Sequence, residues 1–489
     1  MRKHILVSYF LILFLFVGGS CGKTKMPKAE KKEENLACQS CKEITSAQEL
    51  NALTLNPGDT VILQSGQWVD QALIFKAVGT EKNPIVLKAQ ERGKVQLQGT
   101  STLSIEGAWL VIDGLVFQNG HAIDKNVVDF KGSSNHCRLT NTAIMNYNPS
   151  QPNTDYRWIS INGSYNRVDH CYLSGKAHLG PTLVVWGTDQ PMHHRIDHNY
   201  FGTRPAVESN GGETIRLGTS DWSMTSAFTI IEENIFEHCD GETEIISNKM
   251  SENIIRNNLF YESKGTLCLR HGNGTAVYGN YFIGNGIKEA GGIRLVGENH
   301  LIYNNYFQNM AGTGQRSAII LMDGVSNSPL NGYFQVKHIQ VVGNTMVHCK
   351  QSFDIGSGKG GNNRTLPPLS CHIANNVILQ TPQSIAVKWT DTPIDFVYEG
   401  NIAFDVPSSA NLPVGFTIVD PLLVLNSQRL YEPAMESPVI HAAEGSYPFF
   451  SSEDAGAERL DEKHRDLLLA KNIGPAFMTD LGARLDIHP

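Results

Sequence analysis

One short pattern recurs through most of this chain, and it restricts the fold more than any other feature. A run of β-branched and aromatic residues is followed by a polar residue, often Asn, and then by two or three large apolar residues. Clear copies are HRIDHNYF (194–201), ENIIRNNLF (252–260) and TAVYGNYF (275–282). The steps between successive Asn positions range from 22 residues (Asn258 to Asn280) to 39 residues (Asn305 to Asn344). Self-similarity at such a period indicates a solenoid.

The repeats predict strands, because Val, Ile, Tyr and Phe alternate with polar residues and no amphipathic helix fits between them. The Leu framework of a leucine-rich repeat is absent. A β-propeller blade needs four strands, for which the shortest repeats leave too little chain. We therefore expect an all-β, single-domain, right-handed parallel β-helix. Equivalent Asn residues should then stack and hydrogen-bond along its axis.

The repeat and the composition around it suggest four segments. Residues 45–440 form the predicted β-helix, and TSAQELNALTLNPGDT (45–60) is its expected N-terminal cap. Residues 441–489 lose the repeat and are expected to form a C-terminal cap segment, with a helix in AERLDEKHRDLLLA (457–470). Residues 21–44 are polar and charge-rich, as expected of a solvated tether.

The N-terminus has the pattern of an export signal. A basic start is followed by an apolar run, Ile5 to Val17, and by the small residues Gly18-Gly19-Ser20 before Cys21. We expect residues 1–20 to be a signal peptide and Cys21 to be lipidated, although the usual large aliphatic residue three places before Cys is missing. The prediction is an outer-membrane or periplasmic lipoprotein that touches the membrane only through the lipid on Cys21.

Charge and cysteine content narrow the possible partners. The chain has 40 Lys and Arg against 48 Asp and Glu, a formal net charge of −8, which argues against nucleic acid as a partner. Cys38 and Cys41 form a redox pair, half of a metal site or a local disulfide; their spacing does not choose among these. The other Cys residues that follow Cys21 lie mostly in apolar strand-like segments, so we expect small buried side chains.

The densest polar cluster is GETEIISNK (241–249). In a strand, Glu242 and Glu244 point to the same face, and two adjacent carboxylates repel unless a cation lies between them. Such hard oxygen ligands suit Ca²⁺. A Glu-x-Glu strand is also commonly just a solvated face. However, the apolar residues on both sides show that this segment is not merely a polar loop.

A second group of cations follows one short coil later, in CLRHGN (268–273). Lys249 and Arg270 are 21 residues apart, close to one coil, and neighbouring strands lie about 4.8 Å apart. The two cations are therefore expected to be neighbours, with His271 beside them.

NGGETIRLG, GETEIISNK and CLRHGN, in this order and spacing, resemble polysaccharide lyase family six, which contains alginate lyases and chondroitinase B. The resemblance extends from about residue 45 to 440. It implies that Lys249 is the catalytic base and Arg270 the acid. It also implies a calcium site and substrate contacts; the corresponding residues are Asn210, Glu242 and Glu244 for calcium, and His271 and Arg216 for the substrate.

The chemistry of uronate polymers is consistent with these roles. In β-elimination a base removes the C5 proton beside the carboxylate, and the O4 glycosidic oxygen leaves. A cation must take up the charge of the enolate-like intermediate. A lysine base must be neutral, and both Arg270 and Ca²⁺ would disfavour its ammonium form. Free arginine is a poor proton donor, so Arg270 is expected to stabilise the leaving oxygen while water completes the transfer.

Two further residues are weaker candidates for substrate binding. Arg204, in FGTRP, is suited to an anionic sugar because arginine pairs bidentately with carboxylates. Tyr147, in IMNYNPS, lies on an expected loop near the preceding coils, where a tyrosine also commonly ends a strand.

The sequence thus predicts a lyase for an anionic polysaccharide, with alginate as the first substrate, mannuronate-rich chains favoured and Ca²⁺ as cofactor. A dermatan sulfate or chondroitin lyase of the same fold and a non-catalytic glycan-binding β-helix are the alternatives. A polygalacturonase-type hydrolase would need Asp residues clustered on adjacent rungs, whereas this face offers Glu, Lys and Arg. The sequence leaves the oligomeric state open.

Overall fold

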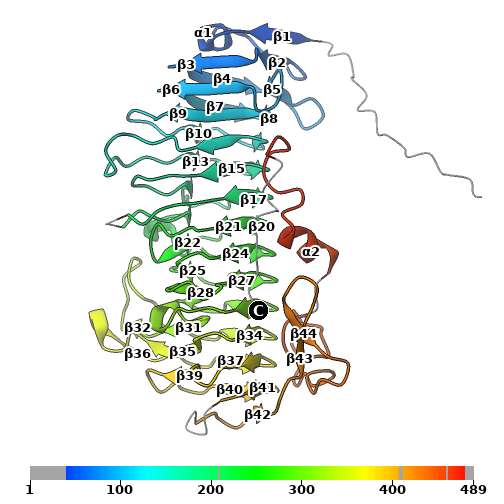
Figure 1. Cartoon of the computed structure of the whole chain (residues 1–489). Coiled ribbons are helices and arrows are strands. Elements are labelled where there is room, and N and C mark those ends of the chain that lie inside the picture. Colours follow the sequence, from blue (N-terminus) through cyan, green and yellow to red (C-terminus); the bar gives the residue numbers. More distant parts are fainter. Residues whose placement is uncertain (1–39, 208–209, 407–410, 459–460, 479–489) are drawn as a thin grey trace, which may run out of the picture. The chain divides into compact units, whose positions relative to one another are not determined.

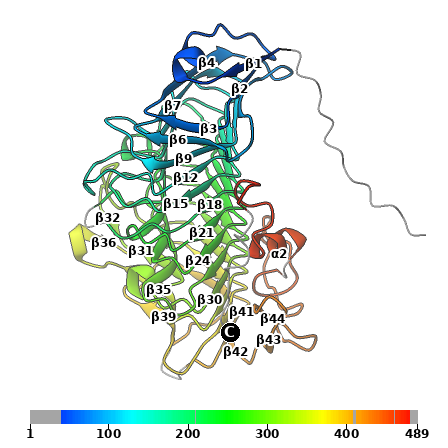
Figure 2. The same ribbon diagram turned by 45° about the horizontal axis from the view of Figure 1, so that its top comes forward.

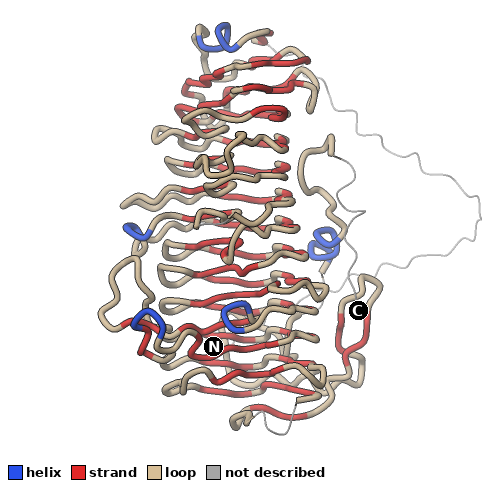
Figure 3. The backbone as a smooth tube through the Cα atoms, turned by 60° about the vertical axis from the view of Figure 1, so that its left-hand side comes forward, coloured by secondary structure: helices blue, strands red, loops and turns tan. Residues whose placement is uncertain are grey.

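The computed structural model describes residues 40–207, 210–406, 411–458 and 461–478. Within them the chain winds through three long parallel sheets, so that each coil adds one strand to each sheet (Figures 1 and 3). This confirms the predicted all-β parallel β-helix.

Two of the sheets contain fourteen strands each and the third contains twelve. The first sheet consists of β1 Cys41–Ile44, β2 Thr60–Leu63, β5 Ile85–Ala89, β8 Leu110–Asp113, β11 Arg138–Thr140, β14 Arg167–Asp169, β17 Arg195–Asp197, β20 Ile230–Glu232, β23 Ile254–Arg256, β26 Ala276–Tyr278, β29 Leu301–Tyr303, β33 Gln340–Val342, β37 His372–Ala374 and β40 Val397–Glu399. The second consists of β3 Gly66–Val69, β6 Val95–Gly99, β9 Leu115–Gly120, β12 Ala143–Met145, β15 Tyr172–Ser174, β18 Tyr200–Phe201, β21 Ile235–Glu237, β24 Leu259–Tyr261, β27 Tyr281–Ile283, β30 Tyr306–Gln308, β34 Thr345–Val347, β38 Val377–Leu379, β41 Asn401–Phe404 and β42 Phe416–Ile418. The third consists of β4 Ala72–Val78, β7 Thr102–Ala108, β10 Val128–Phe130, β13 Ile159–Ile161, β16 Leu183–Val185, β19 Ile215–Leu217, β22 Glu244–Asn248, β25 Gly265–Leu269, β28 Ala290–Leu295, β31 Ile319–Met322, β35 Gln351–Ser357 and β39 Ile385–Trp389.

The remaining elements are short and lie outside the three sheets. They are the helices α1 Ala47–Asn51 and α2 Glu462–Leu468, the antiparallel pairs β32 Gly324–Val325 with β36 Arg364–Leu366 and β43 Leu423–Leu425 with β44 Tyr431–Pro433, and the 3₁₀ turns η1 Ser220–Trp222, η2 Gly314–Arg316 and η3 Gly361–Asn363.

The recurring Asn forms the turn between the first and second sheets. The residue before it has a positive φ, as at Asn257 (53°) and Gly279 (64°), which turns the chain sharply. The Asn itself is fully buried: the Asn258 main-chain N–H and side-chain amide both donate to the Asn280 Oδ1, each at 3.0 Å. Asn280 donates in the same way to Asn305. The predicted Asn stacking along the axis is therefore confirmed.

We expect Asn280→Leu to lower the free energy of unfolding by about 3 kcal/mol or more, because a buried donor or acceptor left without a partner costs about 1–3 kcal/mol. The change removes the acceptor of two Asn258 groups and the amide that donates to the Ile255 carbonyl. Urea unfolding followed by circular dichroism measures it. Asn153→Leu, in an exposed loop, is the matched control. Equal midpoints for the two variants would contradict the role of the Asn stack.

The inside of the coils is apolar. Phe201, Phe236, Phe260, Phe282 and Phe307 stack one above another, with ring centroids 4.5–4.9 Å apart. Among the described residues, six cysteines are buried and free, as expected of small hydrophobic side chains: Cys137, Cys171, Cys239, Cys268, Cys349 and Cys371.

The C-terminal segment differs from the prediction of a cap. It runs back along the side of the stack, over the second sheet and the edge of the first, opposite the side where β32 and β36 project (Figures 1 and 2). The Gly474 N–H donates to the His198 carbonyl at 2.9 Å, many coils away from the end. The physical reason is the outer face of the second sheet, where apolar residues such as Tyr281 need cover; Leu467, Leu468 and Ile473 provide it. The predicted helix at 457–470 is present but shorter, as α2.

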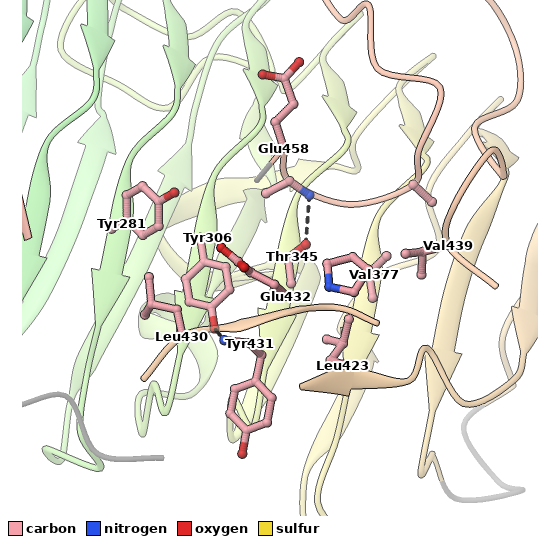
Figure 4. A pocket seen from close by; sticks show the side chains of 13 residues that line it. Tyr281, Tyr306, Thr345, Val377, Leu423, Leu430, Tyr431, Glu432, Val439 and Glu458 are labelled. Carbon is pink, nitrogen blue, oxygen red and sulfur yellow. Dashed lines mark hydrogen bonds between the residues drawn. The ribbon is translucent and has the colours of Figure 1, made fainter. Parts of the chain in front are cut away.

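A small cavity remains where this segment meets the second sheet (Figure 4). The chain is attached on both sides of the cavity: the Tyr431 N–H of β44 donates to the Tyr306 hydroxyl, and the Ala457 N–H of the C-terminal segment donates to the Thr345 hydroxyl. Its volume of about 20 Å³ has room for about one water molecule. It is a packing gap and is too small for a sugar.

At the N-terminal end, the sheet begins earlier than the expected boundary at residue 45. Cys41–Ile44 already pairs as β1 with β2, because its main chain completes the edge of the first sheet. Cys41 is disulfide-bonded. The predicted signal peptide, Cys21 and most of the tether lie outside the described residues. No helix in the ranges described above is long and apolar enough to cross a bilayer.

Candidate active site

The outer face of the third sheet carries a row of polar side chains in register. Arg216 on β19 pairs with Ser247 on β22, Ser247 with Cys268 on β25, and Cys268 with Arg294 on β28. Their chain neighbours, such as Ile215 and Leu217, point into the core. Because successive side chains alternate across a strand, this register places the four residues on one outer surface.

Lys249 and Arg270 lie at the same end of two adjacent strands. Asn248, the last residue of β22, is paired with Leu269, the last residue of β25. Lys249 and Arg270 come next, and the Arg270 N–H donates to the Asn248 carbonyl at 2.8 Å. The prediction that the two cations are neighbours on successive coils is confirmed.

Glu244 connects the row to these cations. Its side chain accepts hydrogen bonds from Arg294 and from the Ser247 hydroxyl, and its Oε1 lies 4.0 Å from the Arg270 Nε. Burial opposes ionisation of this carboxyl, but the nearby Arg294, Ser247, Lys249 and Arg270 outweigh it and hold its pKa below the ordinary value. Glu244 is therefore a half-buried carboxylate, with its side chain 14% exposed, surrounded by cations.

Glu242 has a different environment, although both carboxylates line the same cleft as predicted. Its Oε2 accepts from the Gly211 and Gly212 N–H groups at 3.1 and 3.3 Å. Burial and the neighbouring Glu213 and Glu244 raise its pKa to about 7. Two carboxylates that repel each other in this way are stabilised by a bound cation.

The cleft has a volume of about 650 Å³. Asn210, which is exposed, lines it together with Glu242 and Glu244, so the three expected calcium ligands share one cavity. The other charged residues around it are Asp240, Lys264, Glu289, Arg294 and Arg316.

The donor set fits a hard cation. Within the described ranges no three His, Cys, Asp or Glu side chains converge closely enough to hold a metal by themselves. A calcium ion would therefore need the Asn210 amide oxygen in addition to the two glutamates, with water or main-chain oxygens completing its shell. Glu213 gives independent support for a cation site, because its Oε2 is buried and has no hydrogen-bond partner among the described residues.

Arg270 is held firmly from several directions. Its Nη1 donates to the Gly332 carbonyl at 2.9 Å and lies 3.3 Å from the His271 Nδ1, and its guanidinium lies 4.1 Å from the centre of the Tyr333 ring. His271 is buried, and burial together with Arg270 and Lys249 lowers its pKa to about 3. His271 is thus neutral at physiological pH and offers hydrogen bonds, not charge.

Arg216 stacks on an aromatic ring beside the cleft. Its guanidinium lies 5.3 Å from the centre of the Trp186 ring, as does that of Arg157. The Arg216 Nε is buried and has no hydrogen-bond partner in the part of the chain that the structure describes. The guanidinium is therefore held mainly by its stacking on Trp186.

Two predicted substrate contacts are wrong. Arg204 is 1% exposed, and its guanidinium donates only to main-chain carbonyls, which are those of Lys176, His178, Gly180, Gly211 and Gly212. It joins the loops of neighbouring coils and is closed to substrate. Tyr147 is fully buried, with its hydroxyl donating to the Gly99 and Ser101 carbonyls.

Several residues of the site escaped the sequence prediction. Glu213 stands within NGGETIR, but only the structure places it beside Glu242. Arg294 stands in GGIRL, 24 residues after Arg270, and that one-coil spacing is a signal that would have found it. Trp186 and Tyr333 reach the site from loops, where the repeat gives no register.

Comparisons with known proteins agree with this architecture. A sequence model described as chondroitinase B matches residues 39–440. The structure of the PL6 family alginate lyase AlyGC is 36% identical to this chain, with a TM-score of 0.78; the match covers 85% of this chain and 58% of that one. This chain therefore spans less than two thirds of AlyGC.

Two shorter relatives are covered almost completely. A polysaccharide family 6 lyase from human gut microbiota, described as mannuronic acid specific, is 30% identical with a TM-score of 0.69, over 78% of this chain and 91% of that chain. A PL6 family lyase from Pseudopedobacter saltans is 28% identical with a TM-score of 0.67, over 79% and 98%. No curated protein gives a match. With the sequence model matching most of its length, the chain belongs to the chondroitinase B family, polysaccharide lyase family 6.

Proposed function

We propose that this protein is a polysaccharide lyase that cleaves alginate by β-elimination, with mannuronate-rich chains as the preferred substrate. The observation that carries the proposal is the placement of Lys249 and Arg270 at the ends of adjacent strands, beside the half-buried carboxylate of Glu244. The relatives support the substrate class, since AlyGC is an alginate lyase and the gut lyase is described as mannuronic acid specific.

In the proposed reaction, Lys249 in its neutral form takes the proton from C5 of the uronate. The electron pair of that C–H bond becomes the C4–C5 double bond, and the C4–O4 bond breaks. Arg270 stabilises the negative charge on the departing O4, and a proton reaches this oxygen from the guanidinium or from a water held there. The main contribution of the site is to place a base at the C5 proton and a cation at the O4 leaving oxygen.

The substrate carboxylate must be neutralised for C5 to become acidic. When bound, a calcium ion held by Asn210, Glu242 and Glu244 would supply Lewis-acid stabilisation of the enolate-like intermediate. Among the chain's own groups, Arg216 presents its unpartnered Nε beside the same row, and the neutral His271 is suited to a hydrogen bond with the sugar.

The lyase assay follows ultraviolet absorbance during incubation with poly-mannuronate, poly-guluronate and dermatan sulfate. Elimination leaves a conjugated double bond that absorbs, whereas hydrolysis and simple binding leave none. We expect the fastest rise on poly-mannuronate. An absorbance rise only on dermatan sulfate would support β-elimination but not alginate as the substrate. It would agree with the matched family model, which is described as chondroitinase B. No rise on any polymer would contradict the lyase proposal and favour a glycan-binding protein.

A chelator should slow the reaction by about tenfold or more, since metal-ion catalysis contributes several kcal/mol. Repeating the assay in EGTA, and then adding excess Ca²⁺, measures the effect. Mg²⁺ addition is the control, because its strict octahedral geometry does not suit a loose set of two glutamates and an amide. Full activity in EGTA would mean that Arg216 and Arg294, and not a metal ion, neutralise the substrate carboxylate.

We also infer, from the N-terminal sequence pattern, that the enzyme is exported and anchored through a lipid on Cys21. Metabolic labelling with a palmitate analogue tests this, with Cys21→Ser as the control. A label that persists in Cys21→Ser would contradict it.

A further inference from the structure

The loop between β32 and β33 reaches over the catalytic face and holds Arg270. Three successive residues contact its guanidinium: the Asn331 carbonyl accepts from Nη2 at 3.3 Å, the Gly332 carbonyl accepts from Nη1 at 2.9 Å, and the Tyr333 ring centre lies 4.1 Å away. In the third sheet, β31, which precedes this loop, lies two strands from β25, and Asn331 is 61 residues after Arg270. The contacts are therefore tertiary and are not local to the strand end.

Tyr333 also contacts a second cation, Arg364. The Arg364 guanidinium lies 4.7 Å from the centre of the same Tyr333 ring. Arg364 is buried, its Nε donates to the Gly361 carbonyl at 2.9 Å, and its strand β36 pairs with β32. Two guanidinium groups would repel each other, whereas the electron-rich faces of an aromatic ring attract both. The Tyr333 ring therefore contacts two cations, Arg270 and Arg364, and stabilises both.

These contacts fix the direction in which Arg270 points. A guanidinium has five N–H donors in a rigid plane. Contacts with Asn331, Gly332 and His271 use the Nη1 and Nη2 edge, while the Nε edge faces Glu244 at 4.0 Å. Stacking on Tyr333 prevents the plane from tilting. Since Tyr333 also lines the 650 Å³ cleft, the ring forms part of the wall against which a polymer would lie.

We propose that Tyr333 is a positioning residue that holds the Arg270 guanidinium in the orientation needed to stabilise the leaving oxygen. The proposal rests on the proposed lyase function. It needs only the ring: the Tyr333 hydroxyl makes no hydrogen bond within the described residues, so phenylalanine should hold the Arg270 guanidinium equally well.

The test compares Tyr333→Leu with Tyr333→Phe. Tyr278→Leu is the matched control, because Tyr278 also contacts an arginine, Arg256, at 5.8 Å, but on the first sheet and outside the cleft. We expect kcat on poly-mannuronate to fall about tenfold in Tyr333→Leu, with KM changed much less, because cation–π contacts stabilise a desolvated arginine appreciably. Tyr278→Leu should keep wild-type kcat, and Tyr333→Phe should lose much less kcat than Tyr333→Leu.

A second measurement needs no turnover. Phenylglyoxal modifies accessible arginines, and peptide mass spectrometry reports the modification rate at Arg270 itself, whose side chain is only 17% exposed. We expect Arg270 to react about tenfold faster in Tyr333→Leu than in wild type, Tyr333→Phe or Tyr278→Leu. An unchanged rate, or a kcat for Tyr333→Leu equal to that of the control, would overturn the proposal. If phenylglyoxal modified Arg270 faster in Tyr333→Leu but the wild-type protein had no activity on any polymer, the contact between Tyr333 and Arg270 would be supported. The lyase function would be refuted instead.

Discussion

Replacing Lys249 by Ala is expected to reduce kcat on poly-mannuronate by about 10²–10⁴-fold, the range over which a positioned general base contributes. Lys249 follows the last residue of β22, and its main chain is held by a hydrogen bond from its N–H to the Leu217 carbonyl at 2.8 Å. Alanine keeps that bond, so the coil should stay intact and the thermal unfolding midpoint should barely change. The measurement is the ultraviolet lyase assay alongside a thermal melt.

Two further variants test whether Lys249 acts as a base or only as a positive charge. Lys249→Arg keeps the charge, but arginine stays protonated and cannot accept the C5 proton. It should be nearly as inactive as the alanine variant. Lys264→Ala removes a lysine that lines the cleft, one that is exposed and paired with Asp240 at 3.5 Å, and should retain activity within about threefold. Activity preserved in Lys249→Arg would assign Lys249 an electrostatic role only.

Replacing Glu244 by Ala should have the second largest effect, on both stability and activity. Arg294 is 4% exposed and its main partner is this carboxylate. Removing one member of a buried ion pair costs about 3–5 kcal/mol, because the other charge stays buried without compensation. Urea unfolding should show a loss of this size, and the lyase assay should show no turnover.

A double variant distinguishes loss of structure from loss of function. Replacing both partners of a buried pair by apolar residues is often close to neutral for stability. Glu244→Leu with Arg294→Met should therefore recover most of the lost stability, while the Ca²⁺ dependence and the activity stay absent. Recovery of activity together with stability would mean that Glu244 serves the fold alone and takes no part in the reaction.

The repeat was sufficient to predict the solenoid because the physical requirement is local. A sharp turn followed by a buried amide, repeated in every coil, forces Asn280 and its equivalents into one stack, and the spacing of Asn residues reveals it. The same register predicts that Lys249 and Arg270 are neighbours. Both follow the ends of strands one coil apart, and parallel pairing carries that relation into space.

The errors fall where the chain leaves the repeat. Arg204 and Tyr147 have the chemistry of sugar-binding residues, but their burial depends on loops that fold over them. The C-terminal segment has a helix pattern, but the course of its described residues, 441–458 and 461–478, is decided by apolar residues on the outside of the second sheet, such as Tyr281. A sequence shows which residues are apolar; it does not show which of two surfaces of a coil they cover.

The sequence by itself determined the β-helix, the register of the catalytic face, and the pairing of Lys249 with Arg270 next to two glutamates. These depend on contacts between adjacent coils, which the repeat length fixes. The tertiary structure alone decided the partners of those residues: Arg294 for Glu244, Tyr333 for Arg270 and Trp186 for Arg216. Tyr333 reaches the site through the loop between β32 and β33, and the path of such a loop is set by its packing against other coils, which no periodicity encodes.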